Sequence, residues 1–500
     1  MWPHPKLSAA RLYNYGPKAP TDDENQSVNN RPRNIALFAA SLCLVWCAAP
    51  AARGQVPAPS PAPTPTPIPA AQAAARPAQL KIVTRTLANG LRLVMVENHD
   101  APVISLQMWY HVGSKDERPG HTGFAHLFEH LMFQGSAHVA PEQHTRVIEA
   151  LGGESDAYTQ DDVTVFYETF PSNVLARVMW LEADRMGGLQ ITQEHFESER
   201  EVVKEERRLR VDNRPYGRVI EDLYAAAFTV HPYHHTTIGS MEDLDKATLA
   251  DVTEFFHTYY RPDNCTMILV GDFAADDAVA MAQKYFGGIS KPATPVPRVT
   301  AIEPPQTAER KLVKAYPDSP LPAFVYGYKM PAEFSPDAYS LDLVSNLLAS
   351  GESSWLYHKL VYEDRIAVEV DGGGNFTEDP NLFFVVAVMN QGHTNAEGEK
   401  ETQAVLDQVK ESPLDAHDLE KAKNQQTAAF ILGRDTDEDV ASALGPYAVI
   451  GGDPNLYNSD LDRYLRVTPE DIQRVAKEYF VPEHATLLEV ETPPAPSQGD

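Results

Sequence analysis

The chain has 500 residues, more than one hydrophobic core usually serves, so two or more domains are expected. Its content of 43% hydrophobic and 22% charged residues is ordinary for a soluble globular protein. The net charge of the chain is −28. Residues 1–78 carry a net charge of +4, which leaves −32 for residues 79–500, the body of the chain. So acidic a body argues against nucleic acid as a partner. The body contains one cysteine, Cys265, which excludes an intrachain disulfide and a thiolate metal cluster there.

The first part of the chain is typical of an export signal. Arg31 and Arg33 precede an apolar stretch over residues 35–49, and small residues follow it. This pattern predicts a secretory leader over residues 1–54, and we therefore expect an exported protein, periplasmic in a Gram-negative bacterium. An uncleaved membrane anchor is the alternative.

A proline-rich segment separates this leader from the body. Seven prolines fall within residues 57–69, alternating with Ala, Thr and Ser. Such a composition favours an extended polyproline-type chain that cannot pack, so residues 55–79 are predicted to be a linker.

Regular structure is expected from residue 80 onward. Asn89-Gly90 is a hairpin signal between two strand-like runs. Strands are predicted over residues 82–86, 91–96, 103–110, 156–159 and 164–169. Helices are predicted over residues 141–151, 173–186 and 192–211, in addition to one around residue 128.

That helix around residue 128 contains the motif His126-x-x-Glu129-His130. Two histidines four residues apart share one face of a helix, so both can bind one metal ion, which is usually Zn²⁺. Glu129 leans toward the same face, where a general base for a water molecule belongs. The alternative is an amphipathic core helix with two incidental histidines, but a core helix gives no reason for this placement.

A charged helix over residues 192–211 can supply a third ligand. Glu199 and Glu206 are seven residues apart, which is two helical turns, so they share a face. A charged helix on its own is usually a solvated surface. Because a two-histidine site needs a further ligand to match the catalytic zinc pattern, we predict Glu206 as the ligand and Glu199 as the carboxylate that orients a histidine.

Two other candidates have simpler interpretations. Residues 231–235 contain three histidines, a rival metal cluster, but Pro232 breaks any helix there and no carboxylate stands at a fixed spacing. A loop is the better interpretation. Cys265 precedes the apolar run 266–270, which predicts a buried strand, so we interpret this cysteine as a packing residue.

An internal repeat indicates how the body is divided. Residues 291–307 form a second proline-rich stretch, which we interpret as a linker between domains at 80–290 and 308–492. The same pattern occurs twice, 220 residues apart. The first copy begins with Thr248-Leu-Ala-Asp and closes with Tyr-Tyr-Arg-Pro, and the second begins with Thr468-Pro-Glu-Asp and closes with Tyr-Phe-Val-Pro. Two tandem domains of one fold are therefore predicted, and the metal motif lies in the first.

Together, these motifs resemble the pitrilysin/insulinase family of zinc metallopeptidases, the inverzincins, in the short-chain branch that includes mitochondrial processing peptidases and bacterial two-subunit peptidases. The resemblance covers residues 80–490. It implies an α+β fold in which each domain is an antiparallel sheet covered by helices. It also implies Zn²⁺ bound by His126, His130 and Glu206, with Glu129 as the base and peptides or unfolded polypeptides as substrates.

The sequence departs from the family pattern at two places. Asp156 stands where an Asn is typical. Family members often carry an Arg and, seven residues on, a Tyr that hold the substrate, and the matching positions here are Val361 and Val368. Arg365 and Tyr362 lie nearby but out of register, so the role is not transferred to them.

These departures suggest the catalytic subunit of a heterodimer. A homologous partner subunit would lack the zinc motif and would supply the Arg and the Tyr. The alternatives are a non-catalytic structural subunit and a metal-binding chaperone that holds unfolded peptides without cleaving them. The intact set of His126, Glu129, His130 and Glu206 weighs against the structural subunit, and a peptide-cleavage assay with and without a chelator would separate all three possibilities.

Overall fold

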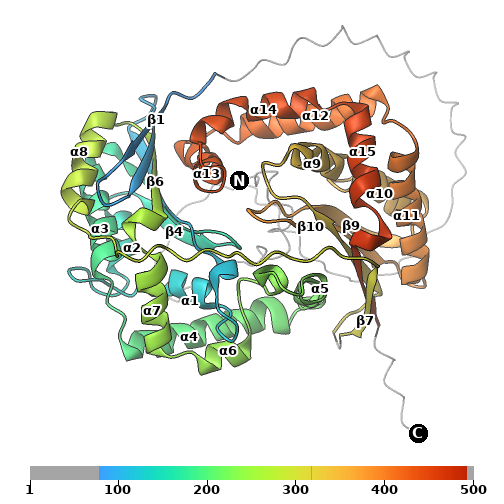
Figure 1. The fold of residues 1–500 in the computed structure, drawn as a ribbon, viewed down its shortest axis with the longest axis horizontal. Helices are drawn as coiled ribbons and strands as arrows, with labels where there is room; N and C mark the ends of the chain where they lie inside the picture. Colours follow the sequence, from blue (N-terminus) through green and yellow to red (C-terminus); the bar gives the residue numbers. More distant parts are fainter. Residues whose placement is uncertain (1–77, 317, 493–500) are drawn as a thin grey trace, which may run out of the picture. The chain divides into compact units, whose positions relative to one another are not determined.

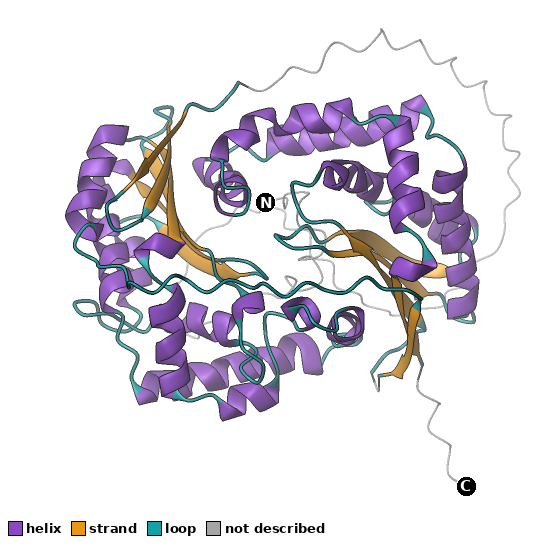
Figure 2. Ribbon diagram, viewed as in Figure 1, coloured by secondary structure: helices purple, strands orange, loops and turns teal. Residues whose placement is uncertain are grey.

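The computed structural model describes residues 78–316 and 318–492. The predicted leader and nearly all of the predicted linker before residue 80 lie outside these residues. Within them, two β-sheets are covered by helices (Figures 1 and 2), which confirms the predicted α+β class with two related units in tandem.

The first unit contains a six-stranded sheet with strand order β1-β2-β6-β3-β5-β4. Its elements are β1 (Ile82–Thr86), β2 (Arg92–Glu97), β3 (Val103–Tyr110), α1 (Phe124–Leu131), α2 (Gln143–Ala150), β4 (Glu154–Thr159), β5 (Thr164–Pro171), α3 (Leu175–Gly188), α4 (Gln193–Arg207), α5 (Val219–Ala227), α6 (Met241–Lys246), α7 (Leu249–Tyr259), β6 (Cys265–Gly271) and α8 (Ala275–Phe286). The predicted strands and helices of this unit are all present, with ends shifted by a few residues.

The second unit contains a five-stranded sheet with strand order β7-β11-β8-β10-β9. Its elements are β7 (Arg310–Ala315), β8 (Ala323–Met330), α9 (Pro336–Leu348), α10 (Trp355–Tyr357), β9 (Ala367–Gly374), β10 (Asn381–Met389), α11 (Asn395–Glu411), α12 (Ala416–Leu432), α13 (Asp437–Val449), α14 (Tyr457–Arg466), α15 (Pro469–Tyr479) and β11 (Ala485–Glu491). The strands pair antiparallel, except that β2 with β6 and β7 with β11 run parallel.

The repeat in the sequence is also a repeat in the structure. Helices α7 and α15 begin with the same capping box, in which Thr248 pairs with Asp251 and Thr468 pairs with Asp471. Each box satisfies N–H groups that the first helical turn would otherwise leave without partners. Each helix then leads into the strand, β6 or β11, that lies inside its sheet.

The two units exchange one helix each. Helix α13 of the second unit covers one face of the first sheet, where Leu444 and Tyr447 pack in one apolar cluster with Trp109. Helix α5 of the first unit covers one face of the second sheet, where Leu223 packs with Phe384. Figure 1 shows α13 beside the first sheet and α5 beside the second. Each sheet is therefore buried on both faces only when both units are present.

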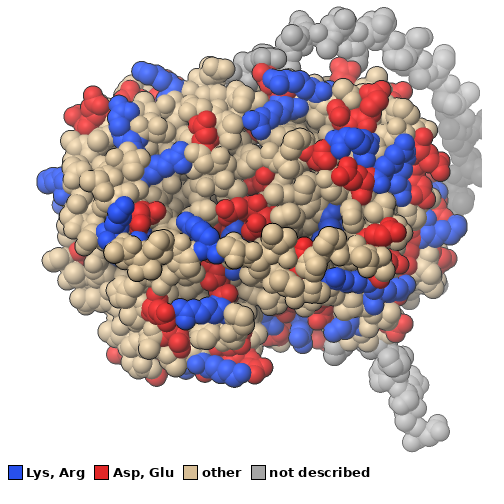
Figure 3. Space-filling view, viewed as in Figure 1, with Lys and Arg blue, Asp and Glu red and all other residues tan. Residues whose placement is uncertain are grey.

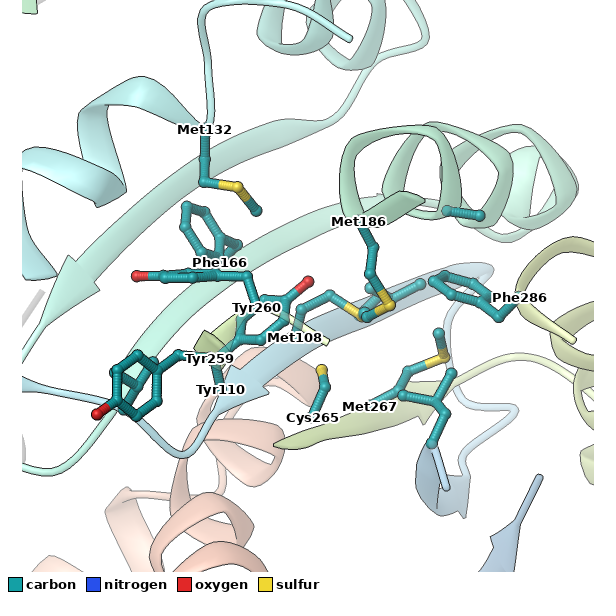
Figure 4. Packing of buried hydrophobic residues seen from close by; sticks show 14 of the residues in the cluster. Met108, Tyr110, Met132, Phe166, Met186, Tyr259, Tyr260, Cys265, Met267 and Phe286 are labelled. Atoms are coloured by element: carbon teal, nitrogen blue, oxygen red, sulfur yellow. The ribbon is translucent and has the colours of Figure 1, made fainter. Parts of the chain in front are cut away.

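The other face of the first sheet holds the main core of that unit (Figure 4). Cys265 lies at the start of β6 among Met108, Tyr110 and Met267, and it is buried. The thiol is therefore packed as the sequence predicted, and burial raises its pKa well above the ordinary value.

The predicted linker at 291–307 has no helix or strand, but side chains fix it to both units. Arg261 donates hydrogen bonds to the carbonyls of Pro292 and Thr294 at 2.9 Å. Gln306 donates to the carbonyl of Ala485, at the start of β11, at 2.6 Å. The segment is thus an extended connection with fixed contacts at both ends.

Charged side chains of both signs are interspersed over the face drawn in Figure 3.

No helix within residues 78–316 and 318–492 is both long and apolar enough to cross a membrane. The apolar stretch considered as a possible anchor lies outside these residues.

Candidate metal centre and active site

Helix α1 is positioned by a buried carboxylate. Gly123, at φ 91°, precedes the helix and has no side chain to cap it. Glu117 takes that role, because its carboxylate accepts hydrogen bonds from the N–H groups of Gly123 at 2.8 Å and Ala125 at 2.7 Å. On the buried side, the ring of Phe128 stacks on that of Phe256 of α7, with centroids 5.5 Å apart.

Helix α4 lies against α1, and two of its glutamates, Glu199 and Glu206, face that helix. The hydroxyl of Thr192 caps the start of α4, and the apolar side chains of Phe196 and Val203 are buried. Glu199 and Glu206 lie on the face toward α1, with side chains only 12% and 16% exposed. This helix is therefore more than a solvated surface, as the metal-site interpretation requires.

His126, His130 and Glu206 come together as the sequence predicted. Each offers one ligand atom, and these atoms all lie within 4.8 Å of one another. The Nε2 atoms of His126 and His130 are 3.6 and 3.4 Å from Oε2 of Glu206. Ligands about 2.0–2.1 Å from a tetrahedral Zn²⁺ stand roughly 3.3–3.4 Å apart, so the donor set fits this ion.

Glu199 contacts one of these histidines. Its Oε2 lies 3.2 Å from Nδ1 of His130, and its Oε1 accepts a hydrogen bond from Gln134 at 2.8 Å. A proton on Nδ1 leaves the Nε2 lone pair of His130 directed toward Glu206, which is the tautomer that binds a metal. The structure thus places Glu199 where the sequence predicted an orienting carboxylate.

The three candidate ligands differ in their protonation. Burial, together with the neighbouring His130, lowers the pKa of His126 to about 4. Burial alone would lower the pKa of His130, but hydrogen bonds with Glu199 and Glu206 raise it to about 10. Burial alone would raise the pKa of Glu206, but the hydrogen bond with His130 lowers it to about 2. A metal that binds here near neutral pH must therefore displace a proton from His130.

Glu129 lies beside these residues without joining them as a ligand. Its Oε2 accepts a hydrogen bond of 2.5 Å from the hydroxyl of Thr159, the last residue of β4. Burial raises the pKa of Glu129 to about 7, against the effect of that hydrogen bond. A carboxylate with a pKa near neutrality is suited to accept a proton and then to release it.

Sequence analysis did not identify three residues that surround this centre. Gln134 and Thr159 bind Glu199 and Glu129, and Arg210 forms an ion pair of 2.7 Å with Oε1 of Glu206. The spacing of four residues between Glu206 and Arg210 is a usable signal, since such residues are neighbours on a helix. The contact between Thr159 and Glu129 has no comparable local signal.

A second group of possible metal ligands proves to be an ionic core cluster. His144, Glu168 and Glu182 are buried between α2, β5 and α3. The guanidinium of Arg185 bonds Glu182 at 2.5 Å and Glu168 at 3.4 Å, and it lies 4.4 Å from the Phe166 ring centroid. Arg185 already supplies the positive charge that a metal ion would bring, so we interpret this group as structural.

The histidines at 231–235 form no metal group within the described residues, in agreement with the loop interpretation. Pro232–His234 is a single 3₁₀ turn that follows His231. The ring of His231 lies 3.3 Å from Asp379, and the hydroxyl of Tyr233 donates to Asp162 at 2.6 Å. This segment therefore contributes to the contact between the two units.

Of the positions that depart from the family pattern, Asp156 and Val368 lie on edge strands, and Val361 lies in the helical turn His358–Glu363. Asp156 is on β4, at the edge of the first sheet, and its side chain is exposed. Val368 is on β9, at the edge of the second sheet, and is 48% exposed, whereas Val361 is partly buried. Tyr362 is exposed and its ring packs against that of His358, with centroids 5.2 Å apart.

Two sequence profiles match the body of the chain. The profile described as "Insulinase (Peptidase family M16)" matches residues 92–240, which contain all five predicted site residues. The profile described as "Peptidase M16 inactive domain" matches residues 246–426.

Individual relatives match over most of their length. The "Zinc protease PqqE" of Helicobacter pylori is 33% identical over 408 residues, which are 81% of this chain and 91% of that protein. A probable mitochondrial-processing peptidase subunit beta of Arabidopsis thaliana is 24% identical over 405 residues, 79% of this chain and 75% of that protein.

Solved structures share the fold. The crystal structure of a protease from Helicobacter pylori superposes with a TM-score of 0.80 and 31% identity, covering 83% of this chain and all of that one. A putative M16-like peptidase from Alicyclobacillus acidocaldarius gives a TM-score of 0.71 at 20% identity, covering 83% of this chain and 99% of that one.

Proposed function

Because the chain belongs to the M16 (insulinase/pitrilysin) family, whose relatives include named zinc proteases, we propose that it is a zinc-dependent endopeptidase that hydrolyses peptides or unfolded polypeptides. The proposal assigns metal binding to His126, His130 and Glu206 and the role of general base to Glu129. The observation that carries it is the complete donor set, within 4.8 Å, with Glu129 on the same helix as both histidines.

The proposed chemistry divides between the ion and the protein. A zinc ion bound by these residues would supply Lewis acidity toward water and the scissile carbonyl. Glu129 would accept a proton from the attacking water and later deliver it to the leaving amine. Glu199 would keep the Nε2 lone pair of His130 available, and the exposed side of the site would admit the substrate.

The match to an inactive-domain profile does not weaken this assignment. It covers residues 246–426, and the candidate ligands and base lie before that range. The second unit is the part of the chain without a metal group among its described residues. A division between one metal-binding unit and one supporting unit is therefore consistent with both profiles.

We also propose that the active assembly is a heterodimer. Val361 and Val368 stand where the family pattern expects an Arg and a Tyr, so a homologous partner subunit would supply these side chains to hold the peptide.

We further propose that the leader predicted over residues 1–54 exports the chain to the periplasm of a Gram-negative bacterium.

The decisive experiment measures cleavage of internally quenched fluorogenic peptides by the purified chain. The chain is assayed alone and co-expressed with a homologue that carries the Arg and the Tyr, each with and without a chelator. Chelator-sensitive cleavage that requires the homologue supports the whole proposal. Full activity of the lone chain would overturn the heterodimer, and peptide binding without cleavage in either preparation would favour a non-catalytic, peptide-holding member.

Glu129→Gln gives the matched test of the base. We expect this variant to bind zinc as the wild type does, because Glu129 is not a ligand, and to lose about 100- to 10,000-fold in kcat. Zinc content and turnover are measured on the same preparation. Retained turnover would remove Glu129 from its role without affecting the metal site.

A further inference from the structure

A hydroxyl on the first sheet contacts the base of the candidate active site. The side chain of Thr159 donates a hydrogen bond of 2.5 Å to Oε2 of Glu129. Among the described residues, no other side chain or backbone group forms a hydrogen bond with the Glu129 carboxylate. The bond from Thr159 engages one carboxylate oxygen and leaves Oε1 for proton transfer.

The end of β4 that carries Thr159 is fixed to the segment 113–117. The N–H of Ser114 donates to the carbonyl of Gln160 at 3.1 Å, and the N–H of Lys115 donates to the carbonyl of Asp161 at 3.0 Å. Gly113 permits this approach, since a Cβ atom there would lie 2.4 Å from both carbonyl oxygens. Thr159 therefore precedes a turn that has little freedom to move.

The same segment also fixes the helix that carries Glu129. Glu117, at the end of residues 113–117, accepts hydrogen bonds from the N–H groups of Gly123 and Ala125 at the start of α1. One short stretch of backbone thus sets the position of the strand end and of the helix start. The hydroxyl of Thr159 and the carboxylate of Glu129 meet across two elements that share this anchor.

We propose that Thr159 is a positioning residue for the reaction: its hydroxyl holds the Glu129 carboxylate in the orientation that accepts a proton from the attacking water. This inference rests on the proposed function. A carboxylate side chain has three rotatable bonds, and the base must reach its proton at about 2.6–3.2 Å. A donor on a rigid strand removes that rotational freedom before the substrate binds, as preorganised sites require.

The test compares Thr159→Val, which keeps the shape of the side chain and removes the donor, with Thr159→Ser, which keeps the donor. Thr169→Val is the matched control, because Thr169 on the adjacent strand β5 also donates to a carboxylate, Oε2 of Glu438, at 2.7 Å. All variants are made in the full chain and assayed in the assembly in which the wild type cleaves a quenched fluorogenic peptide. Zinc affinity is measured separately by chelator competition.

We expect Thr159→Val to lower kcat about 10- to 100-fold, a part of what a general base contributes, with KM and zinc affinity unchanged. Thr159→Ser should restore most of the turnover, and Thr169→Val should leave it unchanged. In a Glu129→Gln background, Thr159→Val should cause no further loss. An unchanged kcat in Thr159→Val, or an equal loss in the Glu129→Gln background, would overturn the proposal.

A structural readout keeps this inference separate from the proposed function. In crystal structures of the zinc-loaded variants, the Glu129 carboxylate should keep its orientation in Thr159→Ser and lose it in Thr159→Val. If the wild type cleaves no peptide, the proposed function fails, and these structures still decide whether Thr159 positions Glu129. An unmoved carboxylate in Thr159→Val would contradict the positioning role whatever the activity.

Discussion

Gly445 on α13 lies directly against the indole of Trp109 on β3. A Cβ atom added at Gly445 would come within 2.0 Å of the Trp109 ring, a distance that van der Waals contact forbids. A residue with a side chain does not fit at position 445 without displacing either α13 or β3.

Gly445→Ala should therefore destabilise the protein, although alanine has a higher intrinsic helix propensity than glycine. We expect the free energy of unfolding to fall by about 1–3 kcal/mol through overpacking. Chemical denaturation measures it. Gly288→Ala is the control, because a Cβ atom there meets nothing within 4 Å. Equal stability of the two variants would contradict the close packing of α13.

Lys115 provides a second test of the contact between the units. Its ammonium is buried and lies 2.8 Å from Asp162 of the first unit and 2.5 Å from Glu378 of the second. Lys115→Met leaves the buried carboxylate of Asp162 without this partner, so we expect a loss of about 3–5 kcal/mol in stability. Lys246→Met removes an exposed ion pair with Glu242 and should leave the stability nearly unchanged.

Glu199→Gln should weaken zinc binding without removing a ligand. The amide cannot accept the Nδ1 proton of His130 as strongly as the carboxylate, so the Nε2 donor becomes less basic and less well oriented. We expect about 10- to 100-fold lower zinc affinity, measured by competition with a chromogenic chelator. Glu197→Gln, an exposed change on the same helix, should leave the affinity unchanged.

The stability should also depend on pH through the segment that connects the units. Burial alone would raise the pKa of Glu303, but hydrogen bonds from the N–H groups of His231, Val230 and Thr229 lower it from 4.5 to about 2. A carboxyl with a lowered folded-state pKa stabilises the fold above its unfolded pKa, and this contribution is lost as pH falls through the folded value. The window is therefore pH 4.5 to about 2.

Glu303→Gln isolates this effect. The variant should be less stable than the wild type at pH 7, and the difference between them should shrink as pH falls from 4.5 to about 2, because the wild-type carboxyl becomes protonated. Denaturant titrations of both proteins across this range measure the difference. Parallel pH profiles would show that Glu303 does not contribute through its charge.

The grouping of His126, His130 and Glu206 could be predicted because its information is local. Helical periodicity alone places His126 and His130 on one face of α1, and Glu199 and Glu206 on one face of α4. A zinc ion bound by residues of both helices requires these two faces to meet. The partner of Glu129 could not be predicted in this way. Thr159 is 30 residues from it along the chain and reaches it through the pairing of β4 with the sheet.

Buried charges were the least predictable feature. Glu182 and Arg185 have the three-residue spacing of a solvated helical ion pair, and nothing local distinguishes them from one. In the structure both are buried with Glu168, because helix α3 turns this face toward the sheet. Likewise, the apolar residues of α13 indicate a buried face, but the sequence does not tell which sheet that face covers.

The exchange of α5 and α13 has a consequence for the origin of the chain. Two copies of one repeat, each lending a helix to the sheet of the other, form the arrangement of a domain-swapped homodimer whose chains have been joined end to end. A protein made of one such repeat would need a second copy to complete itself. Gene fusion would have made that pairing permanent and allowed each copy to diverge in sequence while it continued to cover the sheet of the other.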